Sequence, residues 1–290
     1  MKTLTVIFQF CIYMLFSSSA YSQIKINICN NEKNSLSYVN VSLKGMEDGF
    51  HSNEDGEIVF DERFLNKKVT FNKVGYADTT VTIHFGMDTI VLQKADIYNE
   101  KYPEKDGNRI VKKGILNGNR SGIQSNSARP QIYLQYFPSD DHHGYYLDEI
   151  RFKTKNEIDK AKINLRFYAA NRDLEPEAFL YDKDVLVNVE KGEQINKIDL
   201  SKLNIRIPER GLFVGFENLI IPENIFKYDQ TNLMTEETRT KTDYMPNFVM
   251  LLNEKDNLNS NFAYVLTNGN FHKINNKDMS LSLELKFKRP

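Results

Sequence analysis

The chain has 290 residues, of which 40% are hydrophobic and 27% are charged, and its formal net charge is −1 at pH 7. This length allows more than one domain with its own hydrophobic core. A near-neutral chain with interspersed charges has no electrostatic basis for binding nucleic acid or an anionic membrane, so we expect no nucleic-acid partner.

The N-terminus has the layout of a secretory signal peptide. Lys2 precedes an apolar run at residues 4–16, which is too short to form a stable membrane-spanning helix. Ala20 and Ser22 occupy the small-residue positions before a cut, so we expect cleavage between Ser22 and Gln23. An uncleaved anchor is the alternative. The prediction is an exported protein in the periplasm, on the outer surface or in the medium, with no transmembrane segment after signal removal.

Apolar and polar residues alternate in short segments along the rest of the chain. The period of two is clear at residues 80–85, 162–168 and 279–287, and it is typical of half-buried antiparallel strands. Asp55-Gly56 and Asn268-Gly269 are dipeptides that favour tight hairpin turns. These patterns predict an all-β protein, organised as two sandwiches.

The composition divides the mature chain into three parts. Residues 23–94 form the first predicted sandwich, and residues 129–290 form a second antiparallel sandwich. Residues 95–128 are rich in Gly, Asn, Ser and charge, which predicts a linker whose segment 109–116 docks on the second domain as a strand. A second polar stretch at residues 227–247 is interpreted as a binding loop or a mobile excursion.

The first sandwich resembles a known family. The sequence contains VNVSLKG, Asp55-Gly56, EIVF, VTFNKVGY with Gly75-Tyr76, and DTIVLQK, in that order. This order resembles the carboxypeptidase regulatory-like, transthyretin-like (peptidase-associated) domain of Bacteroidetes envelope proteins. The segment before Asp55 departs from the family pattern, because Ser52-Asn53-Glu54 replaces a small Thr. The resemblance implies a transthyretin-like β-sandwich that accompanies other domains and is not itself catalytic.

The second part carries a less specific resemblance. IDLSKLNIRIPERGLFVGFE joins two predicted strands through a turn at Pro208 and Gly211. It resembles a β-sandwich that follows the regulatory-like domain in secreted Bacteroidetes proteins of unknown function. We expect a jelly-roll-like arrangement for this domain.

His51 and Glu54 have the His-x-x-Glu spacing of a zinc peptidase, which also requires a distant His, a general base and an Arg. The resemblance places both residues in a hairpin of the non-catalytic regulatory-like domain. We therefore predict no zinc-peptidase site there.

The segment SDDHHGYY concentrates possible metal ligands at Asp140, Asp141, His142 and His143, with His272 as a distant further imidazole. Adjacent histidines on an extended chain point in opposite directions, so a polar turn between strands is the favoured interpretation. If the chain binds a metal, the candidate ligands are Asp140, Asp141 and His143, and calcium suits the carboxylates. No catalytic residue and no cofactor are predicted.

Five rings near the start of the second domain could stack on sugars: Tyr133, Phe137, Tyr145, Tyr146 and Tyr168. The chain has no Trp, which offers the largest stacking face, and packing is the favoured role of these rings.

These observations predict an exported, non-catalytic cell-envelope or surface protein for adhesion, scaffolding or ligand capture. A glycan-binding module and an accessory to a TonB-dependent uptake system are alternatives, with a cell-surface glycan or another envelope protein as partner. A metallohydrolase centred on residues 140–143 is the third alternative.

Overall fold

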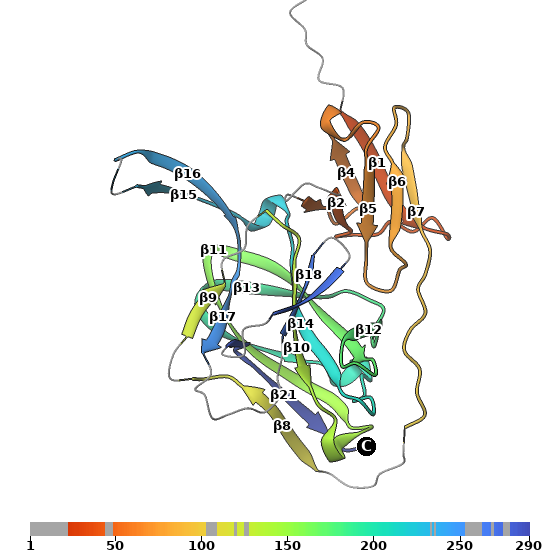
Figure 1. Cartoon of the computed structure of the whole chain (residues 1–290), viewed down its shortest axis with the longest axis vertical. Coiled ribbons are helices and arrows are strands. Elements are labelled where there is room, and N and C mark those ends of the chain that lie inside the picture. The colour runs from red at the N-terminus through yellow and green to blue at the C-terminus, as the bar shows by residue number, and fades with distance from the viewer. Residues whose placement is uncertain are drawn as a thin grey trace, which may run out of the picture.

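The computed structural model describes residues 23–43, 49–102, 109–118, 121–124, 128–232, 234, 236–252, 263–267, 270–274 and 279–290. Within these residues the chain forms 21 β-strands and four 3-10 helices (Figure 1). The all-β prediction is confirmed. The predicted signal peptide and its cleavage after Ser22 lie outside the described residues. No helix among those that are described is long and apolar enough to cross a membrane.

The first domain, strands β1 to β7, is a sandwich of two sheets. One sheet has the order β4-β1-β7, in which β1 lies antiparallel to β4 and parallel to β7. The other sheet has the order β3-β2-β5-β6. The bounds are β1 (Ile24–Asn30), β2 (Asn40–Leu43), β3 (Gly49–His51), β4 (Glu57–Phe60), β5 (Lys68–Asn72), β6 (Thr79–Thr82) and β7 (Thr89–Leu92), with η1 (Glu62–Phe64) between β4 and β5.

Alternation explains how this sandwich closes. Every second residue of β1 and β5 points inward, so Ile26 and Ile28 of one sheet and Val69 and Phe71 of the other are buried in a shared core, where the rings of Phe60 and Phe71 lie 6.4 Å apart across the two sheets. The alternation predicted at residues 80–85 places Phe85 on the same side as Val81 and Ile83, but Phe85 is 64% exposed because β6 ends at Thr82 and a turn follows.

The second domain, strands β8 to β21 without β15 and β16, is one twelve-stranded sheet that folds back on itself. Its central path runs β19-β18-β10-β14-β11-β17-β20. The strands are β8 (Ile110–Ile115), β9 (Ser121–Gln124), β10 (Ile132–Phe137), β11 (Tyr146–Ala170), β12 (Pro176–Phe179), β13 (Val185–Asp199), β14 (Leu212–Asn218), β17 (Asn247–Leu252), β18 (Ala263–Thr267), β19 (Asn270–Ile274), β20 (Met279–Leu281) and β21 (Leu283–Lys288). Three short helices join them: η2 (Asp140–His142), η3 (Ser201–Leu203) and η4 (Pro222–Asn224).

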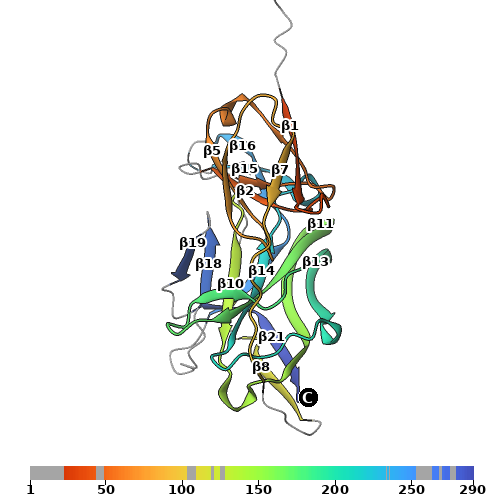
Figure 2. The ribbon, with the colours of Figure 1, turned by 90° about the vertical axis from the view of Figure 1, so that its right-hand side faces the viewer.

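Strand β11 connects the two layers of this domain. Its 25 residues pair with β21 near the start and with β14 near the end, while β13 follows much of its length. Figure 1 and Figure 2 show β11 and β13 bending together across the domain. The layers enclose Phe152, Phe216 and Phe248, whose rings pack with centroids 4.6 Å and 4.9 Å apart.

The linker is docked where the structure describes it. Tyr98 N donates to Phe179 O over 2.9 Å, so the chain after the first domain runs along the second. Strand β8 pairs with β21, as predicted for segment 109–116, and β9 pairs with β17.

The polar stretch at residues 227–247 is not a loop. It lies mainly in a β-hairpin formed by β15 (Ile225–Thr231) and β16 (Thr238–Tyr244), and Asn247 begins β17. We call residues 225–244 the arm. The interpretation as a loop was wrong because both faces of the arm are largely polar, so no alternation of apolar residues marks its strands.

Candidate functional site

The two domains meet through backbone and side-chain hydrogen bonds at His51, at the end of β3. His51 N donates to Ile220 O over 3.1 Å. In return, Ile220 N donates to His51 Nδ1 over 2.9 Å. Because Nδ1 accepts this bond, the neutral ring carries its proton on Nε2. That nitrogen lies 3.4 Å from Glu217 Oε1 of β14.

Five titratable side chains form a buried cluster at this interface. His51 and Lys73 come from the first domain, and Arg166, Asp184 and Glu217 come from the second. The side chains of His51, Arg166 and Glu217 are at most 1% exposed, and that of Lys73 is 5% exposed. We call these residues the interdomain cluster.

Opposite charges are matched within the interdomain cluster. Arg166 pairs with Glu217, and its Nη1 lies 3.7 Å from Asp184 Oδ1. Lys73 pairs with Asp184 and also donates to Ser37 O over 2.7 Å. Two cations and two carboxylates therefore compensate one another, which buried charges require.

The electrostatics follow from this pairing. Burial alone would raise the pKa of Glu217, but Arg166 and the hydrogen bond from His51 lower it to about 2. Burial would lower the pKa of Arg166, yet Glu217 and Asp184 raise it. Burial lowers the pKa of Lys73, and Asp184 opposes that effect. The carboxylate of Glu217 is thus held ionised by the fold.

We predict a specific acid dependence from Glu217. Its folded pKa of about 2 lies below the ordinary value of 4.5, so its stabilisation is present above pH 4.5 and lost as pH falls toward 2. Between pH 5 and pH 3 the loss is on the order of 2 kcal/mol. Urea unfolding at both pH values measures it, and Glu217→Gln should remove this part of the pH dependence. An equal pH dependence in the variant would contradict the assignment.

The sequence analysis considered His51 together with Glu54 and rejected them as a zinc site. His51 faces Glu217 of the second domain, whereas Glu54 is exposed near a turn. Arg166 and Glu217 were missed because they alternate with core residues and so lie on the sheet face expected to meet solvent. In the sequence, the only indication that Arg166 and Glu217 are buried was their position inside strongly apolar strands.

The SDDHHGYY segment lies around η2, and two of its polar side chains lie beside charged groups of other elements. Asp140 Oδ2 is 2.6 Å from Lys113 Nζ of β8, and His143 Nε2 is 3.3 Å from Glu100 Oε1 of the linker. The ring of His143 also lies 5.5 Å from that of Tyr102. Asp141 is exposed.

Arg206 of the second domain contacts the linker on the same surface. Its guanidinium lies 5.1 Å from the ring of Tyr102 and 4.4 Å from that of Tyr146, on which it forms a cation–π contact. Among the described residues no group of three or more His, Cys, Asp or Glu is placed to hold a metal ion. The structure therefore does not bring Asp140, Asp141 and His143 into a common ligand set.

Four of the five rings considered for sugar stacking are buried. Tyr133, Phe137, Tyr145 and Tyr168 are at most 4% exposed. Tyr146 is covered in part by Arg206. A sugar cannot reach these four rings, so they serve packing.

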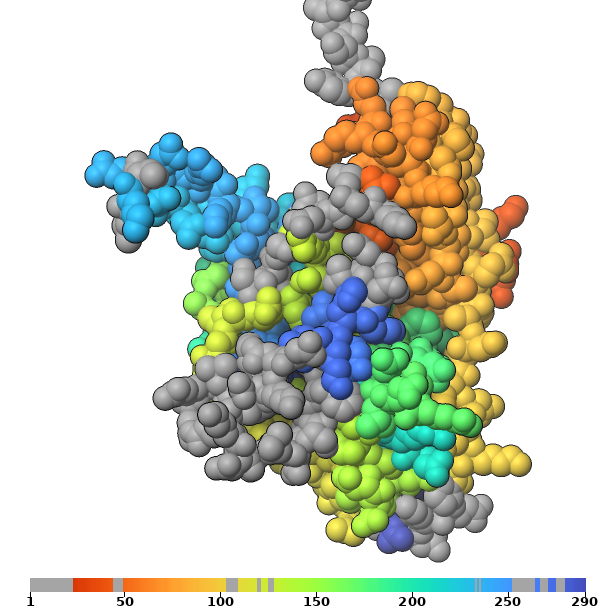
Figure 3. All heavy atoms as spheres, in the orientation of Figure 1, coloured from red at the N-terminus to blue at the C-terminus, as the bar shows by residue number. Residues whose placement is uncertain are grey.

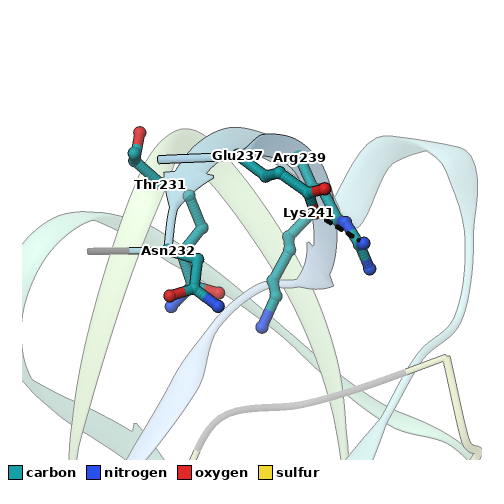
Figure 4. Close-up of a pocket in the computed structure, with 6 residues that line it drawn as sticks. Thr231, Asn232, Glu237, Arg239 and Lys241 are labelled. Carbon is teal, nitrogen blue, oxygen red and sulfur yellow. Dashed lines mark hydrogen bonds and ion pairs between the residues drawn. The ribbon is translucent and has the colours of Figure 1, made fainter. Parts of the chain in front are cut away.

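The arm is not part of the sheets of either domain. Its strands pair with each other and, within the described residues, with no other strand. It projects from the body of the molecule in Figure 1 and stands clear of it in Figure 3. A shallow pocket of about 440 Å³ near its tip is lined by Gln230, Thr231, Asn232, Glu237, Arg239 and Lys241 (Figure 4).

Comparisons with known proteins add little to this description. No protein-family model matches the chain, and no curated protein matches it. Five chains of solved structures match. One is described as the cysteine protease and lectin-like domains of Cwp84, a surface layer associated protein of Clostridium difficile. The match has 12% identity and a TM-score of 0.35, and it covers 60% of this chain and 37% of the other. Similarity at this level carries no argument about function.

Fold and geometry together define a two-domain all-β protein. A buried charge cluster joins its domains, and a two-stranded arm projects from the second one.

Proposed function

We propose that this chain is an exported, non-catalytic protein of the cell envelope or surface, and that it captures a ligand through the arm. The signal-peptide layout of the first residues supports export, and the resemblance of the first domain to regulatory-like domains supports an envelope role. In this proposal the two domains form a rigid support.

The observation that carries the proposal is the arm. A two-stranded hairpin gains little stability by itself, because it has no core to bury. This one is nevertheless held away from both hydrophobic cores, with seven paired positions and polar side chains over most of its surface. Such an extension contributes little to folding, so binding is the role that best accounts for it.

The interdomain cluster supports the same role indirectly. The Lys73–Asp184 ion pair and the His51–Glu217 contact cross the interface, and they favour one relative orientation of the domains. A fixed orientation presents the arm in a constant direction, which lowers the conformational entropy lost when a ligand binds.

Two linked experiments test the proposal. Fractionation of cells that express the full chain should place the protein in the envelope or the medium, and deletion of residues 1–22 should retain it inside the cell. The purified chain from Gln23 should be retained by the isolated envelope of the source organism.

An arm-shortened variant provides the control. Phe226 and Asp243 lie opposite each other, so Asn-Gly can replace residues 227–242 and close a short hairpin. We expect this variant to fold and to lose retention on the envelope. Retention equal to that of the intact chain, or a hydrolase activity abolished by changing a polar cluster, would refute the proposed role.

A further inference from the structure

One face of the arm carries both aromatic and polar side chains. The register pairs Phe226 with Asp243, Tyr228 with Lys241 and Gln230 with Arg239. Side chains of residues directly opposite each other in an antiparallel pair lie on the same face. These six residues therefore share one face, which also contains most of the pocket near the tip.

The two rings form a positioned apolar element on this face. Phe226 and Tyr228 lie with their centroids 5.6 Å apart and their planes 21° from parallel, and both side chains are partly exposed. Burial and the neighbouring Asp243, to which the hydroxyl donates a hydrogen bond, raise the pKa of Tyr228. That hydrogen bond restrains the ring before any ligand arrives.

Lys241 supplies a positive charge beside these rings. Across the described part of the chain it makes no hydrogen bond or ion pair, whereas Arg239 Nη2 is 2.9 Å from Glu237 Oε2. Figure 4 shows Lys241 and Asn232 pointing to the same side of the arm, with Glu237 and Arg239 joined above them. The face thus offers one free ammonium group, nearby amides and two rings.

We propose that the arm binds an acidic polysaccharide through this face, with a sugar ring against Phe226 and Tyr228 and a uronic carboxylate on Lys241. The proposal rests on the proposed function and names its ligand class. A pyranose ring has an apolar face that packs on aromatic rings, and its hydroxyl groups match the amides of Gln230 and Asn232. The carboxylate complements the unpaired charge of Lys241.

The same features argue against a protein partner on this face. A stable protein interface buries on the order of 1,000 Å² or more around a desolvated apolar core. Here two partly exposed rings are surrounded by charged and amide side chains on strands of seven residues. A nucleic acid is disfavoured because its affinity depends on several Lys or Arg contacts to phosphates, and this face offers one lysine without an ion-pair partner.

The experiment compares alginate and polygalacturonate with neutral dextran of similar length, using isothermal titration calorimetry on the chain from Gln23. We expect binding of at least one acidic polymer and none of dextran. Lys241→Gln should weaken that binding about tenfold, as expected for loss of one charge-assisted contact. Tyr228→Leu should weaken it as well.

Lys227→Gln is the matched control, because Lys227 is an exposed lysine on the opposite face of the same hairpin. We expect it to change affinity less than twofold. An equal loss in both lysine variants, or equal binding of dextran, would overturn the inference. If no acidic polymer binds while the arm still mediates envelope retention, the ligand class is wrong and the proposed function stands. If no acidic polymer binds and the arm also does not mediate envelope retention, both the ligand class and the proposed function are refuted.

Discussion

Replacing Glu217 with glutamine is expected to lower the free energy of unfolding by about 3–5 kcal/mol, because it leaves a buried guanidinium without its closest counter-charge. Arg166 and Glu217 have side chains that are 1% and 0% exposed, so water cannot solvate the orphaned charge. Asp184, at 3.7 Å, compensates only in part. The amide oxygen of glutamine can still accept a hydrogen bond from His51 Nε2, so the substitution isolates the effect of charge. Urea unfolding at pH 7 measures it.

Two controls define what this result means. Arg63→Gln removes an exposed partner of Asp61 and should cost no more than about 1 kcal/mol. Joint replacement of Arg166 and Glu217 by methionine removes both charges and should recover much of the lost stability. A cost for Glu217→Gln as small as that of Arg63→Gln would show that the interdomain cluster does not hold the fold together.

Replacing Gly75 with alanine is expected to destabilise the contact between the domains. Gly75 has φ of +77°, a backbone conformation that costs an L residue about 1–3 kcal/mol. A Cβ there would also overlap the carbonyl oxygen of Asp182 in the second domain. That segment leads to Asp184, the partner of Lys73, so the overlap should disturb the interdomain cluster as well.

Gly86→Ala separates the two effects. Gly86 has φ of +80°, but a Cβ there would meet no atom within 4 Å. Both variants carry similar backbone strain, and only Gly75→Ala carries the overlap. We expect Gly75→Ala to lower the urea midpoint further and to increase the radius of gyration in solution scattering. Equal effects of the two substitutions would mean that the backbone at Asp182 moves away from the added Cβ without a measurable cost in free energy.

The class of fold and much of the strand pattern could be predicted from local sequence. Ile26 and Ile28 alternate with exposed residues in β1, and Leu283, Leu285 and Phe287 do so in β21. The polarity of each residue indicates which face of its strand it occupies, so the buried face can be predicted without knowledge of the neighbouring strands. Segment 109–116 was predicted to dock as a strand because it stands out from the polar composition of the linker, and β8 pairs with β21.

The arm shows where that reasoning stops. Its strands bury neither face, so their side chains carry no apolar period, and the polar composition was interpreted as a loop. Four of the five rings that the sequence offered for sugar stacking are buried, while Phe226 and Tyr228, which remain partly exposed, were not considered.

The sequence by itself determined the all-β class and the turn glycines at residues 56 and 75. Only the tertiary structure decided what covers the outer face of β11 and β14. Arg166 and Glu217 alternate with core residues as surface residues do, and they are buried because the first domain packs over them. Alternation records which side of a sheet a residue occupies, whereas burial of that side depends on segments far away in the chain.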